Sequence, residues 1–180
     1  LIAGPIIPYN KIGWQIESER KTTAEMRLSG FLRFIFGLSK KVLIANVLGE
    51  TVEELYKLEP GSIDTLTAWA MSIGYTMQLY FDFSGYSDMA IGICKMIGIS
   101  IPENFNFPYI SKSITEFWRR WHISLSSWFK EYLYIPLGGN RNGTYRTIIN
   151  LFIVFLATGI WHGSEIKFVL WGVGHGILLI

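Results

Sequence analysis

Charge and cysteine are both scarce in this sequence. Charged residues make up 17% of the 180 positions, against about 25% in an ordinary soluble domain. The single cysteine, Cys94, excludes an internal disulfide, and no Cys and His residues stand at the spacing of a structural zinc site. We therefore expect neither a disulfide framework nor a bound metal, and no nucleic-acid partner.

Several catalytic and targeting motifs are missing as well. No Gly-x-Ser-x-Gly elbow supplies a serine nucleophile, and no Gly-x-x-x-x-Gly-Lys loop supplies a phosphate cradle. No basic-headed signal peptide precedes Leu1, and the chain ends within an apolar run. We expect a piece of a longer protein, although a processed or trimmed chain would look the same.

Two segments lack formal charge over nearly the length of a membrane span. They are Thr65–Phe81 and Thr147–Ser164, and each approaches the roughly 17–25 apolar residues that a helix needs to cross a bilayer. Both contain Thr, Ser or Gln, so we expect helices packed inside a bundle. A third uncharged stretch covers 168–180. Half of all residues are hydrophobic, and together these features predict an all-α, polytopic membrane protein.

Charge is arranged in blocks along the chain. Five acidic residues and one basic residue lie within 50–64, whereas seven basic and three acidic residues lie within 95–146. Because basic loops tend to stay on the cytoplasmic side, we expect the loops at 104–112 and 136–146 in the cytoplasm and the acidic block outside. The second uncharged segment then runs outward and carries His162 toward the outer half of the membrane.

Three further stretches carry polar interruptions. Residues 31–48 are apolar but contain three basic residues near their middle, which predicts a helix that ends at its basic side or lies at the interface. Gly and Ser at 82–86 predict a helix break, with Asp88 early in the next element and paired with a basic neighbour.

Residues 114–135, projected at 100° per residue, place Trp on one face and Arg and Lys on the other. This pattern predicts one amphipathic helix in the membrane interface; a soluble core-facing helix would give the same projection.

The three histidines differ in their surroundings. His162 lies near the end of an apolar segment, where an ionisable group is costly and is a functional hypothesis by default; the alternative is a histidine bonded to a neighbouring helix. His122 lies at the border between the two faces of the amphipathic helix, as an interfacial hydrogen-bonding group or a catalyst. His175 stands among glycines, which indicates close helix packing rather than catalysis. A neutral imidazole can relay a proton in acyl transfer, so the predicted chemistry is centred on histidine.

Several segments, taken together, resemble the membrane-bound O-acyltransferase family in its alginate O-acetyltransferase branch. In chain order the main ones are Ile2-Ala3-Gly4-Pro5-Ile6, Gly37-Leu38-Ser39-Lys40-Lys41, Tyr80-Phe81-Asp82-Phe83-Ser84-Gly85-Tyr86, Pro102-Glu103-Asn104-Phe105-Asn106, Phe117-Trp118-Arg119-Arg120-Trp121-His122, Leu137-Gly138-Gly139-Asn140-Arg141 and Trp161-His162-Gly163. Their order extends over nearly the whole chain. We therefore interpret 1–180 as a partial domain of this family, truncated at both ends.

The resemblance implies a many-pass helical fold in the bacterial inner membrane, with a funnel through it. It implies that His162 and His122 are catalytic. The expected reaction is acetyl transfer from a cytoplasmic thioester, acetyl-coenzyme A, toward hydroxyls of an exported polysaccharide or cell-wall glycan, with no tightly bound cofactor. Membrane lipids surround the protein, and an extracytoplasmic partner with a serine-hydrolase-like domain completes the transfer. The alternatives are D-alanyl transfer to teichoic acid and a transporter or docking subunit without enzymatic activity.

Overall fold

The computed structural model describes residues 5–179, and every regular element in that range is helical, as predicted. By its internal contacts the chain divides into two compact units. The first contains Tyr9–Glu103, and the second contains Ile6–Pro8 and the chain from Asn104 onward. The first resembling segment, at 2–6, lies largely outside the described residues.

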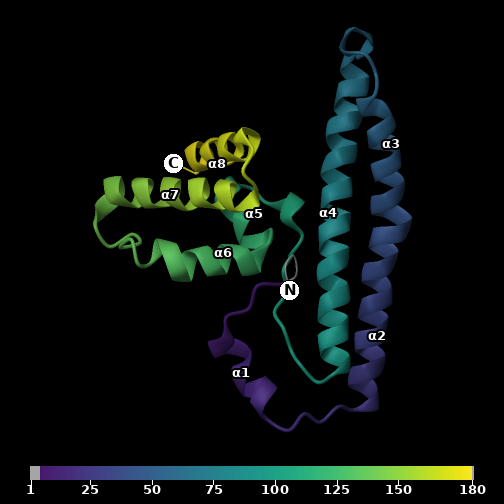
Figure 1. The fold of residues 1–180 in the computed structure, drawn as a ribbon, viewed down its shortest axis with the longest axis vertical. Helices are drawn as coiled ribbons and strands as arrows, with labels where there is room; N and C mark the ends of the chain where they lie inside the picture. The colour runs from purple at the N-terminus through teal and green to yellow at the C-terminus, as the bar shows by residue number, and fades with distance from the viewer. Residues whose placement is uncertain (1–4, 180) are drawn as a thin grey trace. The chain divides into compact units, whose positions relative to one another are not determined.

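The first unit is a long helical hairpin with a short helix beside it (Figure 1). Its elements are α1 (Tyr9–Glu17), α2 (Ala24–Ser39), the π-helical segment η1 (Lys40–Ala45), α3 (Asn46–Tyr56), the 3-10 turn η2 (Pro60–Ser62) and α4 (Thr65–Met96). Two caps define where its helices begin: the Thr23 side chain accepts from the Met26 N–H at 3.1 Å, and Asp64 accepts from the Thr67 N–H at 2.7 Å. The continuous helix α2–η1–α3 thus packs against α4 along one hairpin.

Paired glycines bring the two arms of this hairpin together. A Cβ on Gly37 would lie 2.5 Å from the carbonyl oxygen of Gly85, and one on Gly30 would lie 2.7 Å from that of Gly92. A spacing of seven residues keeps both glycines of a helix on nearly one face, so the backbones touch at two levels, as small residues permit in membrane helices. The predicted helix break at 82–86 is therefore wrong, because the small residues there serve helix contact within the continuous α4.

Ion pairs with carboxylates on α4, one of them buried, explain the basic residues on the opposite arm. Asp88, 6% exposed, accepts from Arg33 Nε at 2.7 Å and from Lys40 Nζ at 2.6 Å, and Lys41 pairs with Asp82. The predicted pairing of Asp88 is confirmed. The prediction that the helix ends at its basic side is wrong, because carboxylates on α4 neutralise these cations and the chain continues through η1 into α3.

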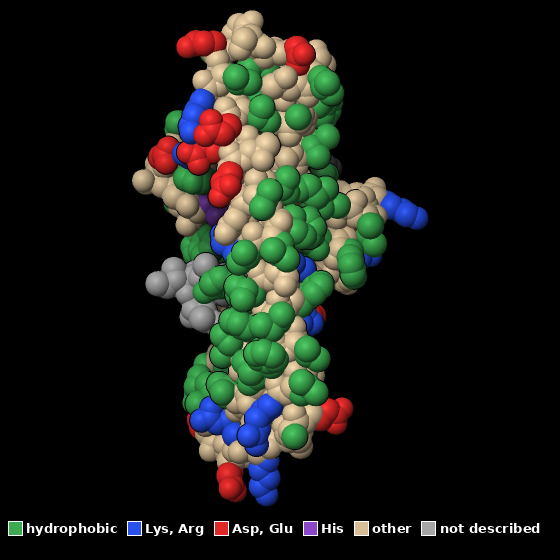
Figure 2. All heavy atoms as spheres, turned by 90° about the vertical axis from the view of Figure 1, so that its right-hand side faces the viewer, with side chains coloured by type: hydrophobic (Ala, Val, Ile, Leu, Met, Phe, Trp, Pro, Cys, Tyr) green, Lys and Arg blue, Asp and Glu red, His purple; other side chains and the backbone are tan. Residues whose placement is uncertain are grey.

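The outer face of the hairpin is apolar. Figure 2 shows hydrophobic side chains along its length, with acidic side chains toward the α3–α4 turn and basic ones toward the start of α2. Exposed hydrophobic side chains on the α2–η1–α3 arm include Leu28, Phe31, Leu32, Phe36, Leu43 and Val47. A large exposed apolar patch marks a surface that contacts lipid or protein.

The second unit is built from short helices packed on two longer ones. Its elements are the 3-10 turn η3 (Pro108–Ile110), α5 (Ile114–Arg120), α6 (Ile123–Phe129), the π-helical segment η4 (Lys130–Tyr134), α7 (Gly143–His162) and α8 (Ile166–Leu178). Leu125, Phe129 and Val154 form its apolar core. Helix α7 is the one described helix that is long and apolar enough to cross a membrane, and it matches the predicted span apart from its ends.

Two sets of contacts hold helix α7 against its neighbours. The buried Asn150 amide donates to the carbonyls of Leu137 and Gly139 at 3.2 and 2.9 Å, and so binds the preceding turn, where Gly138 and Gly139 adopt φ of 105° and 57°. At the other end, a Cβ on Gly159 would lie 2.4 Å from the carbonyl oxygen of Phe168. Helices α7 and α8 therefore approach closely beside His162.

Candidate active site around three histidines

His122 lies at a break between two short helices. Helix α5 ends at Arg120, α6 begins at Ile123, and His122 adopts the left-handed conformation with φ 44° and ψ 54°. The predicted single helix over 114–135 is therefore wrong. A non-glycine residue in this region is uncommon, and such strain is often found at functional sites.

The buried amide of Asn104 holds this break. Its Oδ1 accepts from the Ser124 N–H at 3.1 Å and the Ser124 hydroxyl at 2.8 Å, and it lies 3.2 Å from His122 Nδ1. Its carbonyl accepts from the Ile123 N–H at 2.9 Å. Because Oδ1 can only accept, Nδ1 of a neutral His122 is the donor, and Nε2 is then the basic nitrogen. Asn104 is fully buried and fixes both the ring and its tautomer.

Burial also sets the charge of His122. With a 4% exposed side chain, His122 has its pKa lowered to about 4, chiefly by desolvation and further by the charge of His162. Helices α5 and α6 have seven residues each, too short to span a bilayer. His122 is thus a neutral imidazole near pH 7, close enough to His162 for their charges to interact.

His162 is the last residue of α7 and is exposed. Its ring contacts Trp161, Phe168 and Trp171, at centroid distances of 5.0, 6.4 and 5.2 Å. A Cβ on Gly163 would lie 2.5 Å from the Phe168 ring, so only glycine at this position lets that ring lie beside the imidazole. His162 therefore presents its imidazole from an aromatic setting.

His175 belongs to the same aromatic cluster. Its ring centroid lies 4.6 Å from Trp171 and 5.2 Å from Trp118 on α5. The predicted close packing in this region is seen in Gly172, where a Cβ would lie 2.5 Å from the Phe155 carbonyl oxygen. The cluster links His175 to His162 through the shared Trp171.

The structure therefore brings the predicted pair, His122 and His162, into one unit with His175 nearby. Two neutral imidazoles with aromatic walls can pass a proton between a hydroxyl and a leaving group. Neither the role of Asn104, which lies in one of the motifs, nor that of Trp171 was predicted from the sequence. A polar Asn within the motif Pro102-Glu103-Asn104-Phe105-Asn106 was the available signal for the first.

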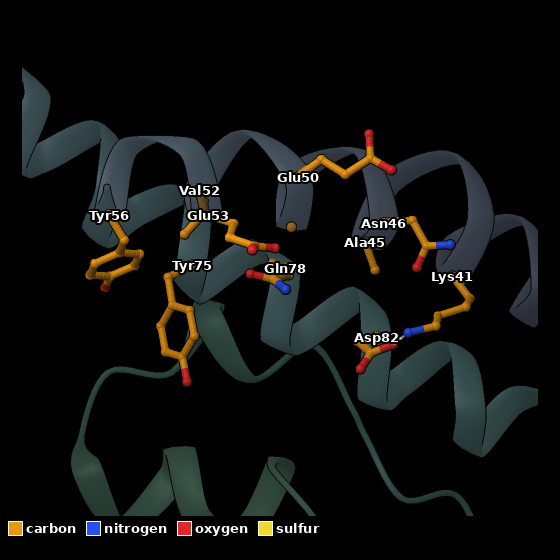
Figure 3. Close-up of a pocket in the computed structure, with 11 residues that line it drawn as sticks. Lys41, Ala45, Asn46, Glu50, Val52, Glu53, Tyr56, Tyr75, Gln78 and Asp82 are labelled. Carbon is orange, nitrogen blue, oxygen red and sulfur yellow. Dashed lines mark hydrogen bonds and ion pairs between the residues drawn. The ribbon is translucent and has the colours of Figure 1, made fainter. Parts of the chain in front are cut away.

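A separate groove lies in the first unit, between α3 and α4. It has a volume of about 430 Å³, and Tyr56, Tyr75, Gln78 and the Lys41–Asp82 pair point into it (Figure 3). Its remaining lining includes Glu50 and Glu53. None of the predicted site histidines contributes to this groove.

Comparison with known proteins places the chain among membrane acyltransferases. The model of the membrane-bound O-acyltransferase family matches residues 1–180. The chain is 49% identical over 179 residues to the probable alginate O-acetylase AlgI of Pseudomonas aeruginosa, covering 99% of the chain and 34% of that relative. It is 46% identical over 181 residues to the peptidoglycan O-acetyltransferase of Helicobacter pylori, covering 99% and 34%.

A more distant similarity is to the teichoic acid D-alanyltransferase of Bacillus subtilis. That relative is 40% identical over 113 residues, which cover 59% of the chain and 29% of the relative. The chain spans about a third of the length of the curated relatives that it matches.

Proposed function

Because the chain belongs to the membrane-bound O-acyltransferase family, we propose that the full-length protein transfers acetyl groups from acetyl-coenzyme A toward hydroxyls of an exported polysaccharide or cell-wall glycan. We further propose that it is a multi-pass protein of the bacterial inner membrane. The single observation that carries the chemistry is that a buried His122, held by Asn104, lies in the same unit as an exposed His162 and close enough for their charges to interact.

In the proposed reaction His162 acts as the general base. Its imidazole takes the proton of the attacking hydroxyl, the hydroxyl oxygen forms a bond to the thioester carbonyl carbon, and the C–S bond then breaks. The departing thiolate takes up the proton, so the histidine ends as it began. His122, held by Asn104, supplies a second neutral imidazole with a defined tautomer, which supports a role in orienting the donor or relaying the proton.

The names of the relatives support the choice of acyl group. The two O-acetyl-transferring relatives are 49% and 46% identical over 99% of the chain, whereas two D-alanyltransferases are 40% identical over 59% of it (Bacillus subtilis) and 31% identical over 99% of it (Streptococcus thermophilus). D-alanyl transfer is therefore the second candidate. Family membership speaks against a transporter or a purely docking subunit. We also propose an extracytoplasmic partner with a serine-hydrolase-like domain, which would carry the acetyl group onward to the polymer.

The experiment that tests this function uses membrane vesicles containing the full-length protein, its proposed extracytoplasmic partner and the acceptor glycan. Radiolabelled acetyl-coenzyme A is supplied on the cytoplasmic face, and a D-alanyl carrier protein is supplied in a parallel reaction. The proposal predicts label in the glycan from acetyl-coenzyme A alone. Label from the D-alanyl donor alone would support the second candidate, and none from either would overturn both.

A further inference from the structure

The groove between α3 and α4 is a cavity that the site histidines do not line. Its volume of about 430 Å³ is enough for a small ligand. Along α4 it extends from Tyr75 to Asp82 (Figure 3), which is about 10 Å of helix. Tyr56 and Tyr75 stand at one end of the groove, and the Lys41–Asp82 ion pair stands at the other. The groove therefore joins an aromatic end to a charged end.

Small and apolar residues form the floor of this groove. Ala45 and Val52 line it and are buried, with exposures of 2% and 4%. A Cβ on Gly49 would lie 2.8 Å from Gln78 Nε2, so glycine at this position lets the Gln78 amide lie against α3. The amide is thereby placed in the middle of the groove, between the tyrosines and the ion pair.

The polar lining offers both donors and acceptors of hydrogen bonds. Gln78 and Asn46 carry amides that do both, Lys41 Nζ donates, and the Asp82 carboxylate accepts. The Lys41 and Asp82 side chains stay 41% and 46% exposed within their ion pair, so a ligand can reach them. A ligand that matches this lining needs several groups that both donate and accept, as hydroxyl groups do.

The two tyrosines add a requirement for an apolar face. Tyr56 and Tyr75 are 59% and 49% exposed, and each offers an apolar ring beside a polar hydroxyl. A sugar ring has a face of C–H groups that packs on an aromatic ring, and its hydroxyl groups point outward. A lipid chain would leave the polar lining unpaired. Among the described residues no group of His, Cys, Asp and Glu could hold a metal ion, so the lining fits a sugar best.

The charge of the groove selects a neutral sugar. Lys41 neutralises Asp82, Glu53 lies 3.9 Å from Lys57 Nζ, and Figure 3 shows Glu50 pointing away from α4. A phosphate or a uronic acid would meet two carboxylates and a lysine that is already paired. A basic side chain would gain little, because each carboxylate that faces the groove already has a cation beside it.

We propose that the groove between α3 and α4 binds neutral sugar units of the acceptor glycan, with Tyr56 and Tyr75 packing on a sugar ring and Gln78 bonding to its hydroxyl groups. The turn after α3 lies in the acidic block, which charge predicts on the outer side, where an exported glycan is present. This inference rests on the proposed function, because it takes the ligand to be the acceptor. It narrows the acceptor to a glycan that contains neutral units.

The test measures the binding of soluble probes to the full-length protein in lipid nanodiscs, which contain no sugar-based detergent. Three probes are titrated by calorimetry: chitotetraose, which is a neutral oligosaccharide, tetramannuronate, which is an anionic one, and tetralysine. Tyr75→Ala removes one aromatic ring, and Gln78→Leu removes the amide while keeping a side chain of similar size. The matched control is Tyr145→Ala, since Tyr145 is a 79% exposed tyrosine on α7, outside the groove.

We expect chitotetraose to bind the unmodified protein and the Tyr145→Ala variant with the same affinity. Tyr75→Ala should weaken this binding about tenfold, and Gln78→Leu about fivefold, as the loss of one aromatic contact and of one hydrogen bond predicts. Tetramannuronate and tetralysine should not bind measurably at the same concentrations.

Four results would overturn the inference. They are no binding of chitotetraose to the unmodified protein, unchanged affinity in both groove variants, equal or tighter binding of tetramannuronate, and binding of tetralysine that the groove variants weaken. The last result would assign the groove to a basic segment of a partner protein. If Tyr75→Ala does not accumulate, Gln78→Leu decides.

Failure of the proposed function is distinguishable, because the titration contains no acyl donor. Binding of chitotetraose without acetyl transfer in the vesicle assay would contradict the proposed function. Acetyl transfer in that assay without binding of chitotetraose would contradict the groove as a site for neutral sugar units.

Discussion

At the scale of single residues, the account depends on how buried polar groups are satisfied. His122 is held at a helix break by Asn104, with both side chains almost completely buried. Asp88 is held by two cations on the opposite arm of the hairpin. In each case one polar group is shared by partners from different segments. Removing such a group leaves its partners buried and unpaired, which is more costly than losing one contact.

The lowered pKa of His122 predicts a pH-dependent stability. The ordinary value is 6.5 and the folded value about 4, so between these pH values the unfolded state binds more protons than the folded state. The free energy of unfolding therefore has its full value above about pH 6.5. It decreases by on the order of 3 kcal/mol as the pH falls toward 4. We expect the thermal midpoint of the full-length protein in detergent to fall between pH 7 and pH 5.

His122→Asn is the matched variant for this prediction. Asn tolerates the left-handed backbone and does not titrate, so the decrease between pH 7 and pH 5 should become smaller. The same decrease in the variant and the unmodified protein would show that His122 does not titrate as described.

Asp88 and Asp82 provide a comparison between a buried and an exposed ion pair. Their side chains are 8% and 46% exposed. Asp88→Asn leaves Lys40 without its carboxylate partner and Arg33 with Glu103 alone, and it should lower the free energy of unfolding by roughly 3–5 kcal/mol. Asp82→Asn should cost less than about 1 kcal/mol. Equal effects in a denaturation assay would contradict the burial of Asp88.

At the scale of helices, the glycine pairs determine how closely α2 and α4 pack. Gly37→Val inserts carbons where a Cβ already lies 2.5 Å from the Gly85 carbonyl oxygen, so the backbones must separate. We expect a loss of about 1–3 kcal/mol in stability. Gly61→Ala is the control, since nothing lies within 4 Å of its Cβ. Thermal unfolding of both variants checks this, and equal midpoints would refute the close contact.

The helices also show which features of the fold could be predicted from the sequence. The helix at 147–164 and the pairing of Asp88 followed from the absence of charge and from the cost of an unpaired buried carboxylate. The break at 82–86 was predicted wrongly, because Gly85 meets Gly37, a residue 48 positions away that helical periodicity does not reveal. The break at His122 was missed for a similar reason. It depends on Asn104, which approaches from an earlier loop.

At the scale of the whole molecule, charge distribution predicts orientation in the membrane. The α3–α4 turn lies in the acidic block, and the turn before α7 lies in the basic one. With Cys94 replaced by Ser, a membrane-impermeant maleimide should label Ser62→Cys in intact cells. It should label Asn142→Cys only after the membrane is permeabilised. The reverse labelling pattern would show that the chain has the opposite orientation in the membrane, with His162 near the cytoplasmic face.

The sequence predicts His122 and His162 as the candidate catalytic residues, and the structure adds the groups around them. His122 and His162 lie in one unit, and His175 joins them through Trp171. None of these contacts identifies the acceptor glycan, since the chain covers about a third of the length of its relatives. The central claim is therefore that His162 performs acyl transfer whatever the acceptor.

The most direct measurement is the acetyl content of the exported polymer in cells that carry the full-length protein with His162→Ala. The account predicts that acetylation falls to the background of a deletion strain while the protein accumulates normally in the membrane. Normal acetyl content with normal expression of His162→Ala would contradict the assignment of His162 as the acyl-transfer base.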